Sequence, residues 1–340
     1  MRSKSRQCGR ASVPASEGRS LRHTFAVCAY GKSPYLEACL KSLENQQGMQ
    51  RAAGTPGAEL CAEERQAPET SVAARHTARK PAAVKPVKPV ESAQSCIILC
   101  TSTPSTFLEE IAARHGIPLY VREGKSSLRD DWNFAVACAR EKTGAQLVTI
   151  AHQDDIYHRE YAAALQAAAR RYPDLSVFCT RYRTIDGAGQ LIEGKAEAVK
   201  RLLRLPLRLK FLANRRFVKR LPLRFGNGIG CPTCSYRLER CGLPLFQTDA
   251  QFVIDWDTLW RLAGREGRFV CIERPLLDYR VHAGAATMAN IRNHNREREE
   301  LDLFRRIWPA PVARLLMHFY RSAYGAYPAD NSRGTEAEKR

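Results

Sequence analysis

The chain has 340 residues, with 54 Lys and Arg against 35 Asp and Glu, which gives a formal net charge of +19. With 44% hydrophobic residues, this length can bury one large core or two modest ones, which excludes a peptide, a miniature scaffold and an acidic disordered chain. The positive surplus favours polyanionic partners such as nucleic acid, anionic lipid or phosphorylated compounds, and it says nothing of the fold.

The sequence contains no pattern of export or membrane insertion. No apolar segment follows the basic first residues, and no run approaches the ~18 to 20 apolar residues of a membrane span. The twelve cysteines lie mostly inside apolar, strand-like runs, where buried thiols sit in proteins of a reducing compartment. We therefore expect a cytoplasmic protein without disulfides.

Short apolar runs alternate with helical patterns along most of the chain. The run Phe25–Ala29 is followed by a turn containing Gly, Ser and Pro and then by a helical pattern, YLEACLKSLENQ. After an interruption, we expect strands at 95–100, 118–121, 147–150 and 176–180 and helices at 107–114, 128–140 and 161–170. This alternation predicts an α/β fold with a mostly parallel, Rossmann-like sheet flanked by helices on both faces.

Three segments fall outside the alternation. Residues 1–20 are predicted to be a disordered basic tail. Residues 48–93 are rich in Ala, Pro, Gly and charged side chains, and they are predicted to be a disordered, low-complexity insertion, because such a segment buries too little apolar surface to fold. The folded domain is expected at 21–308 around this insertion, and 309–340 is expected to form a C-terminal helix and a disordered tail.

Much of the positive charge lies in one stretch, residues 200–224. KRLLRLPLRLKFLANRRFVKRLPLR contains ten Lys and Arg and no Asp or Glu, and its leucines create apolar faces. We predict basic amphipathic helices that dock peripherally on the anionic inner face of the cell membrane. The alternative is a solvated basic face whose leucines pack on the domain. Nucleic acid is a poorer fit, since no helix-turn-helix or zinc module accompanies the stretch.

The sharpest local signal is His152-Gln153-Asp154-Asp155, directly after the apolar run LVTIA. Parallel sheets bind their ligands beyond the carboxyl ends of the strands. Two adjacent carboxylates there repel each other unless a cation such as Mn²⁺ or Mg²⁺ neutralises them. The alternative is that Asp155 caps the next helix and Asp154 is simply solvated.

A second carboxylate, Asp255, lies in the segment FVIDWDTLWRL. On a helix, Val253, Trp256 and Trp260 form an apolar stripe beside it. A carboxylate flanked by bulky apolar groups has a raised pKa and serves as a general base. The alternative is an ordinary acidic residue at a helix N-terminus, favoured by the helix dipole.

The run Cys231–Cys234, CPTC, is consistent with half a zinc site or a redox pair. No second pair with ligand spacing exists in the sequence. We therefore predict buried or half-buried thiols in a strand on the substrate side.

Taken in order, these motifs resemble those of the family 2 glycosyltransferases, which are inverting enzymes of the GT-A fold. FAVCAYGKSPYLEACLKSLENQ resembles the first strand, nucleotide-contacting loop and first helix of that family, and HQDD resembles its metal-binding Asp motif. FGNGIGCPTCSYR resembles the acceptor-side segment, DWDTLWRL the helix of the base, and DYRVHAGAAT the Arg-x-His segment that closes the donor site. Five matches in the right order are specific, and they cover 21–308 apart from the insertion.

The resemblance implies transfer of a sugar from a nucleotide-diphosphate sugar, usually a UDP-sugar, to a hydroxyl acceptor in surface polysaccharide or glycolipid synthesis. As the catalytic base it implies Asp255. As ligands of Mn²⁺ or Mg²⁺ it implies Asp154, Asp155 and His282. For His282 the alternative is a histidine at a strand end with a satisfied hydrogen bond. As contacts of the donor it implies Ala29, Tyr30, Thr101, Asn133, Asp154 and Arg280.

Three departures from the family pattern leave the nucleotide and the metal ligands open. CTST stands at 100–103 where the family commonly has DDGS, His152 replaces the first Asp of the motif, and Ile254 replaces a Glu. Two other functions stay open: a sugar-phosphate nucleotidyltransferase, which shares the fold, and a catalytically inactive membrane-surface adaptor with a GT-A domain. The retained carboxylates argue against the adaptor, whereas the missing Asp at Thr101 argues for it.

Overall fold

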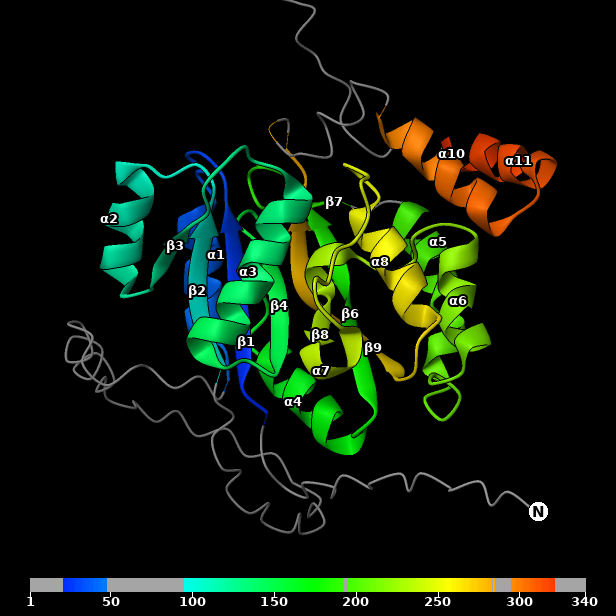
Figure 1. The fold of residues 1–340 in the computed structure, drawn as a ribbon, viewed down its shortest axis with the longest axis horizontal. Coiled ribbons are helices and arrows are strands. Elements are labelled where there is room, and N and C mark those ends of the chain that lie inside the picture. Colours follow the sequence, from blue (N-terminus) through cyan, green and yellow to red (C-terminus); the bar gives the residue numbers. More distant parts are fainter. Residues whose placement is uncertain (1–20, 48–94, 193–194, 283, 285–294, 322–340) are drawn as a thin grey trace, which may run out of the picture.

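The structure is a computed structural model that describes residues 21–47, 95–192, 195–282, 284 and 295–321. The predicted tail at 1–20, the predicted insertion at 48–93 and the end of the chain after residue 321 lie outside the described residues. Figure 1 shows the described part as a central sheet between helices.

The N-terminal half of the sheet is parallel. The central strand β1 pairs with β2 on one side and with β4 on the other, and β2 pairs with β3. These strands are β1 (His23–Ala29), β2 (Ser95–Thr101), β3 (Leu119–Val121) and β4 (Leu147–His152). The helices between them are α1 (Leu36–Glu44), α2 (Thr106–His115) and α3 (Leu128–Thr143). The predicted alternation of strands and helices is confirmed in this half.

The C-terminal half adds three short antiparallel strands. The sheet order is β3-β2-β1-β4-β8-β6-β9-β5, with β7 paired to β6. The two long strands, β6 (Leu175–Ile185) and β9 (Arg268–Arg280), are parallel to each other. The antiparallel strands are β5 (Ile156–Tyr157), β7 (Leu191–Ile192) and β8 (Ser235–Arg237). The sheet is therefore mostly parallel, as predicted.

Two hydrophobic cores cover the two faces of the sheet. Along β1, Ala26 packs into the core that contains α3, whereas its neighbours Phe25 and Val27 pack into the core that contains α1 and α4 (Tyr161–Arg171). Both faces are buried, which explains why β1 is a continuous apolar run instead of an alternating one. Helix α3 begins at Ser127, which caps its N-terminus, and ends at Gly144 in the left-handed conformation.

The helical elements after β7 are α5 (Lys195–Leu203), η2 (Leu205–Arg208), α6 (Arg216–Arg224), η3 (Cys231–Thr233), α7 (Leu238–Cys241), α8 (Ile254–Ala263), α10 (Asn295–Ile307) and α11 (Ala310–Arg321). Helices α5, α6, α8, α10 and α11 gather at one end of the sheet, whereas α7 lies beside β8 (Figure 1). The predicted basic stretch forms α5, a 3-10 turn η2 and α6, so the prediction of basic amphipathic helices is confirmed. Within the described ranges, none of the helices has the length and apolarity needed to cross a bilayer.

Candidate functional site

The loops that follow β1 and β4 are tied together by one glutamine. The two strands are parallel neighbours, so their carboxyl ends meet at the same edge of the sheet. The backbone N–H of Tyr30 donates to Gln153 Oε1 at 3.0 Å, and Gln153 Nε2 donates to the carbonyl of Tyr30 at 3.1 Å. The Tyr30 side chain is 64% exposed. Its ring is therefore accessible beside the Asp motif, while Ala29 is buried at the end of β1.

Hydroxyl groups at the end of β2 support the same loop. Thr101 Oγ1 accepts a hydrogen bond from the backbone N–H of Thr103 at 3.0 Å, and Thr103 Oγ1 accepts one from Gly31 at 3.0 Å. Gly31 has a φ of 59°, which favours glycine. Thr101, which stands at an acidic position of the family pattern, and Thr103 therefore hold the loop that follows β1.

Asp154 faces two residues from distant parts of the chain. Ser33 Oγ donates to Asp154 Oδ1 at 2.6 Å, and His282 Nε2 lies 3.2 Å from Asp154 Oδ2. This His282 nitrogen is buried and lacks the geometry of a hydrogen bond to any described residue. The structure thus brings together Asp154 of the HQDD motif and His282 of the Arg-x-His segment, while their role as metal ligands stays a prediction.

Asp155 joins the end of β4 to the end of β9. It is only 1% exposed, and its Oδ1 accepts a hydrogen bond from the backbone N–H of Arg280 at 2.9 Å. Burial raises the pKa of this carboxyl well above its ordinary value. The alternative interpretation of Asp155 as a helix cap is wrong, because the residue before α4 is Glu160.

Arg280 uses its guanidinium to hold backbone of the two neighbouring loops. Nε donates to the carbonyl of Asp154 at 2.9 Å, and one terminal nitrogen donates to the carbonyls of Asp186 and Gly187 at 3.0 and 3.2 Å. The guanidinium carbon lies 4.5 Å from the centre of the Tyr35 ring, which is 4.9 Å from the ring of His282. Arg280 therefore positions the Asp motif, and its predicted contact with phosphate stays a prediction.

The atoms near the Asp motif are of the types that Mn²⁺ and Mg²⁺ bind. Two carboxylates and an imidazole are present, and Asp155 Oδ2 is a buried oxygen without a hydrogen-bond partner among the described residues. Within that part of the chain, however, no three His, Cys, Asp or Glu side chains already converge on one point as ligands. The donor set therefore fits the predicted cation in its chemistry.

His152, the residue in place of the family's first Asp, is a packed side chain. Its ring stacks on Trp132 with 5.5 Å between the centroids. Burial lowers the pKa of His152 to about 4, so the imidazole is neutral at physiological pH.

Asp255 lies in the first turn of α8 and bonds to the segment FGNGIG. Asn227 Nδ2 donates to Asp255 Oδ2 at 2.7 Å. Burial raises the pKa of Asp255 to about 6, although this hydrogen bond and those from the helix backbone lower it. The predicted raised pKa is confirmed. Sequence reasoning missed Asn227 as the partner, and the only signal was its place in the acceptor-like segment.

The thiol of Cys231 is close enough to both Asp255 and Asp155 to be affected by their charges. Burial and the charges of Asp255 and Asp155 together raise the pKa of its thiol. Its neighbour Pro232 is held by the Tyr157 hydroxyl, which donates to the Pro232 carbonyl at 2.6 Å. Both cysteines of the CPTC run are free thiols, with Cys231 half-buried and Cys234 buried, as predicted. The predicted strand is wrong at this position, because the run forms the 3-10 turn η3 and β8 begins only at Ser235.

Asn133 makes both of its amide hydrogen bonds with the backbone of Phe246, at 2.8 and 2.9 Å. Its assignment to the donor site stays a prediction. Two residues earlier on α3, Asp131 accepts hydrogen bonds from Arg122 at 2.7 Å and from Ser102 at 3.0 Å. Sequence reasoning missed this cluster, which stands at the ends of β2 and β3.

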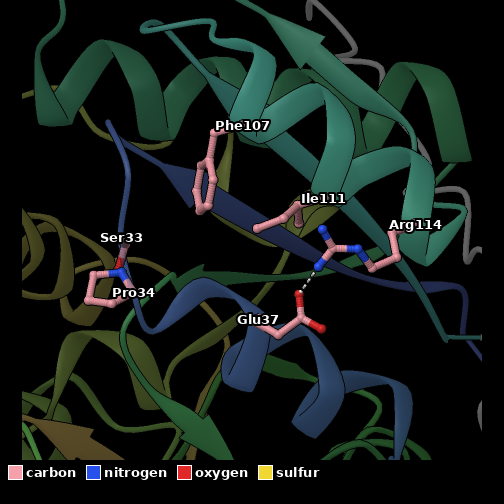
Figure 2. Close-up of a pocket in the computed structure, with 6 residues that line it drawn as sticks. All are labelled: Ser33, Pro34, Glu37, Phe107, Ile111 and Arg114. Atoms are coloured by element: carbon pink, nitrogen blue, oxygen red, sulfur yellow. Dashed lines mark hydrogen bonds and ion pairs between the residues drawn. The ribbon is translucent and has the colours of Figure 1, made fainter.

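An open depression of about 410 Å³ lies beside the loop after β1. Figure 2 shows its walls, with Phe107 and Ile111 of α2 on one side and the ion pair of Arg114 with Glu37, at 3.0 Å, at one end. Ser33 lines the depression and also donates to Asp154, so the depression adjoins the Asp motif.

Comparisons with protein-family models and with curated proteins give no match. Among solved structures, a fragment of S. aureus TarS has 12% identity and a TM-score of 0.46, covering 76% of this chain and 60% of that one. The TarS fragment in complex with UDP-GlcNAc has 10% identity and a TM-score of 0.49, covering 90% and 73%. The mannosyltransferase PcManGT from Pyrobaculum calidifontis, in complex with GDP-Man and Mn²⁺, has 14% identity and a TM-score of 0.47, covering 92% and 77%. At these values the likeness is no guide to the chemistry of this chain.

Proposed function

We propose that this chain is an inverting, metal-dependent glycosyltransferase of family 2. It transfers a sugar from a nucleotide-diphosphate sugar, with a UDP-sugar as the first candidate, to a hydroxyl acceptor of a surface polysaccharide or glycolipid. The observation that carries the proposal is the approach of His282 Nε2 to Asp154 Oδ2, 3.2 Å apart at the strand ends. Asp255, a buried carboxylate of pKa about 6 that Asn227 holds, provides a group suited to the role of general base. The five motifs in family order support the same conclusion.

The donor is expected to bind across the carboxyl ends of β1, β2 and β4. The exposed ring of Tyr30 offers a stacking surface for the nucleobase, and the preceding residue, Ala29, is the register partner of Thr101 at the ends of β1 and β2. The ligands of the cation would be Asp154 and His282, with Asp155 contributing its unpartnered oxygen. When bound, Mn²⁺ or Mg²⁺ supplies positive charge that neutralises the leaving diphosphate.

Asp255 is the proposed general base. A pKa of about 6 leaves the carboxylate mostly ionised at neutral pH, and it remains a stronger proton acceptor than an ordinary aspartate. Asn227 fixes the orientation of its carboxylate by donating to Oδ2. As Asp255 takes the proton of the acceptor hydroxyl, the oxygen attacks the anomeric carbon opposite the leaving diphosphate, which inverts the configuration.

Thermal unfolding with and without UDP plus Mn²⁺ tests the donor site. A ligand at a hundredfold excess over its Kd stabilises by about 2.7 kcal/mol, which corresponds to a rise in Tm of roughly 5–10 °C for a domain of this size. The rise should vanish in Asp154→Asn and persist in Asp302→Asn, which changes an exposed aspartate on α10. No rise in the unaltered chain, or an equal rise in Asp154→Asn, would overturn this donor site. Nucleotide release from a panel of nucleotide sugars would then identify the donor.

A further inference from the structure

The C-terminal helices leave large apolar side chains exposed. Of the fifteen such side chains that are exposed in the described part of the chain, ten lie on residues 195–225 and on α11. The ten are Val199, Leu202, Leu205, Leu209, Phe211, Phe217, Phe225, Val312, Leu315 and Phe319. Phe211 and Phe217 are 71% and 63% exposed. A gathering of this kind marks an interaction surface, since scattered single residues need no such explanation.

The two segments lie side by side at the C-terminal end of α6. Trp308 Nε1, from the turn between α10 and α11, donates to the carbonyl of Arg224 at 2.9 Å. The backbone N–H of Asn227 donates to the hydroxyl of Tyr320 on α11 at 3.3 Å. Figure 1 shows α11 at the same end of the molecule as α5 and α6. We call the exposed residues of 195–225 and of α11 the basic apolar surface.

Burial distinguishes a buried and an exposed group of basic residues in this region, apart from four that are half-buried: Lys200, Lys210, Arg220 and Arg224. Arg204 and Lys219 are buried, and they donate to backbone carbonyls: Arg204 to Gly228 at 2.7 Å, and Lys219 to Arg265 and Gly267 at 2.6 and 2.8 Å. The basic side chains on the outside are different, because they are exposed and make no ion pair with a described residue. These are Arg201, Arg208, Arg215, Arg216 and Arg314.

We propose that the basic apolar surface docks on a bilayer that contains anionic lipid. Exposed arginines match the charge of anionic headgroups, and exposed Phe and Leu side chains enter the boundary between headgroups and acyl chains. No Asp or Glu stands between residues 200 and 225 or within α11, and Glu197 on α5 is half-buried, 3.5 Å from Arg204, so these segments present no exposed carboxylate to such a surface. The docking itself does not require glycosyl transfer. If the proposed function holds, the docking has a further consequence: Asn227 bonds to both Asp255 and Tyr320 of α11, so the docked surface brings Asp255 towards a lipid-borne acceptor.

Flotation of the full chain with vesicles tests the docking directly. The vesicles are phosphatidylcholine alone or phosphatidylcholine with phosphatidylglycerol, at physiological salt. We expect flotation with the anionic vesicles only. The variant Arg215→Gln/Arg216→Gln should lower the partition coefficient about thirtyfold, since each basic side chain near an anionic leaflet contributes about fivefold. Phe211→Ser/Phe217→Ser should also release the chain.

Matched controls distinguish the effect of this surface on flotation from the effects of net charge and of exposed apolar side chains elsewhere. Arg140→Gln/Arg170→Gln removes the same charge from exposed positions on α3 and α4, and Leu191→Ser removes an exposed apolar side chain from β7. Both controls should float like the unaltered chain, and all variants should keep its Tm.

Three results would overturn the proposal: no flotation, equal flotation with neutral vesicles, or equal losses in the surface variants and the controls. Binding to an oligonucleotide in place of vesicles, lost in the same surface variants, would also overturn it. None of these readouts requires donor or turnover, so failure of the docking is distinct from failure of the proposed function.

Discussion

Polar side chains are arranged differently in two regions of the molecule: the carboxyl ends of β1 and β4, and the basic apolar surface. At the strand ends, side chains are partnered with each other across long sequence distances, as Gln153 is with the backbone of Tyr30 and Ser33 with Asp154. On the basic apolar surface, Arg215 and Arg216 are exposed next to exposed Phe217. A preorganised site suits a small ligand, whereas exposed charge beside apolar area suits an extended partner. The two regions therefore predict different sensitivities to substitution.

The largest effect is expected for Asp255→Asn. If Asp255 is the base, this change should lower kcat by about 10²- to 10⁴-fold and leave the Tm rise with UDP and Mn²⁺ unchanged. Asp257→Asn is the matched control, because it lies on the same helix and pairs with Arg306 at 2.5 Å. Steady-state kinetics of the two variants give the values of kcat to be compared. Residual turnover close to that of Asp257→Asn would remove Asp255 from the role of base.

The next effect is on the pH profile of kcat/KM. Protonation of Asp255 removes the proton acceptor, so activity should fall about tenfold per pH unit below a pKa of about 6. Asn227 donates to the ionised form and lowers this pKa. Asn227→Ala should therefore move the acid limb to higher pH. A limb at the same pH in both proteins would show that another group controls the profile.

A smaller effect is expected on stability when the buried lysine of α6 is replaced. Lys219→Met leaves the carbonyls of Arg265 and Gly267 without their donor and should cost about 1–3 kcal/mol of unfolding free energy. Arg216→Met, three residues earlier and exposed, should change it by less than about 0.5 kcal/mol. Urea denaturation measures both. Equal costs would contradict the division of basic residues into buried and outward groups.

The smallest effect is expected for Gln153→Glu. The carboxylate keeps an acceptor for the N–H of Tyr30 but loses the donor to its carbonyl, which should cost about 1 kcal/mol. Gln190→Glu, at an exposed position, serves as the control. Urea denaturation again gives the comparison. A cost no larger than that of Gln190→Glu would mean that the two loops are held together by other contacts.

The sequence was enough to predict what depends on local pattern. Apolar runs marked the parallel strands β1, β2, β3, β4 and β6, whereas the long strand β9 was not among the expected strands. The apolar neighbours of Asp255 indicated its raised pKa, since burial of a carboxyl depends on which residues surround it on the helix. The three-residue strand β8 and the antiparallel pairing of β5 were not predicted, because two or three residues carry too little periodicity.

Contacts between distant segments were beyond sequence reasoning. Gln153 is 123 residues from Tyr30, and Asn227 is 28 residues from Asp255, so neither pair leaves a local pattern. The charge count at 200–224 also gave no sign that Arg204 and Lys219 turn inward, because that depends on which face of each helix the sheet covers. The number of basic residues in a stretch can be counted in the sequence, whereas which of them point inward is set by tertiary packing.

The position of β1 in the sheet has a consequence for how the chain folds. β1 is the first strand in the sequence and stands at the middle of the parallel half, yet His23 pairs with Ser95 on one side and with Leu147 on the other. Such distant parallel pairing slows folding, even though the equilibrium cost of a longer connection grows only slowly with its length. During synthesis, this apolar strand leaves the ribosome long before either neighbour exists. Until then it is an aggregation-prone segment and a binding site for a chaperone that recognises extended apolar peptides.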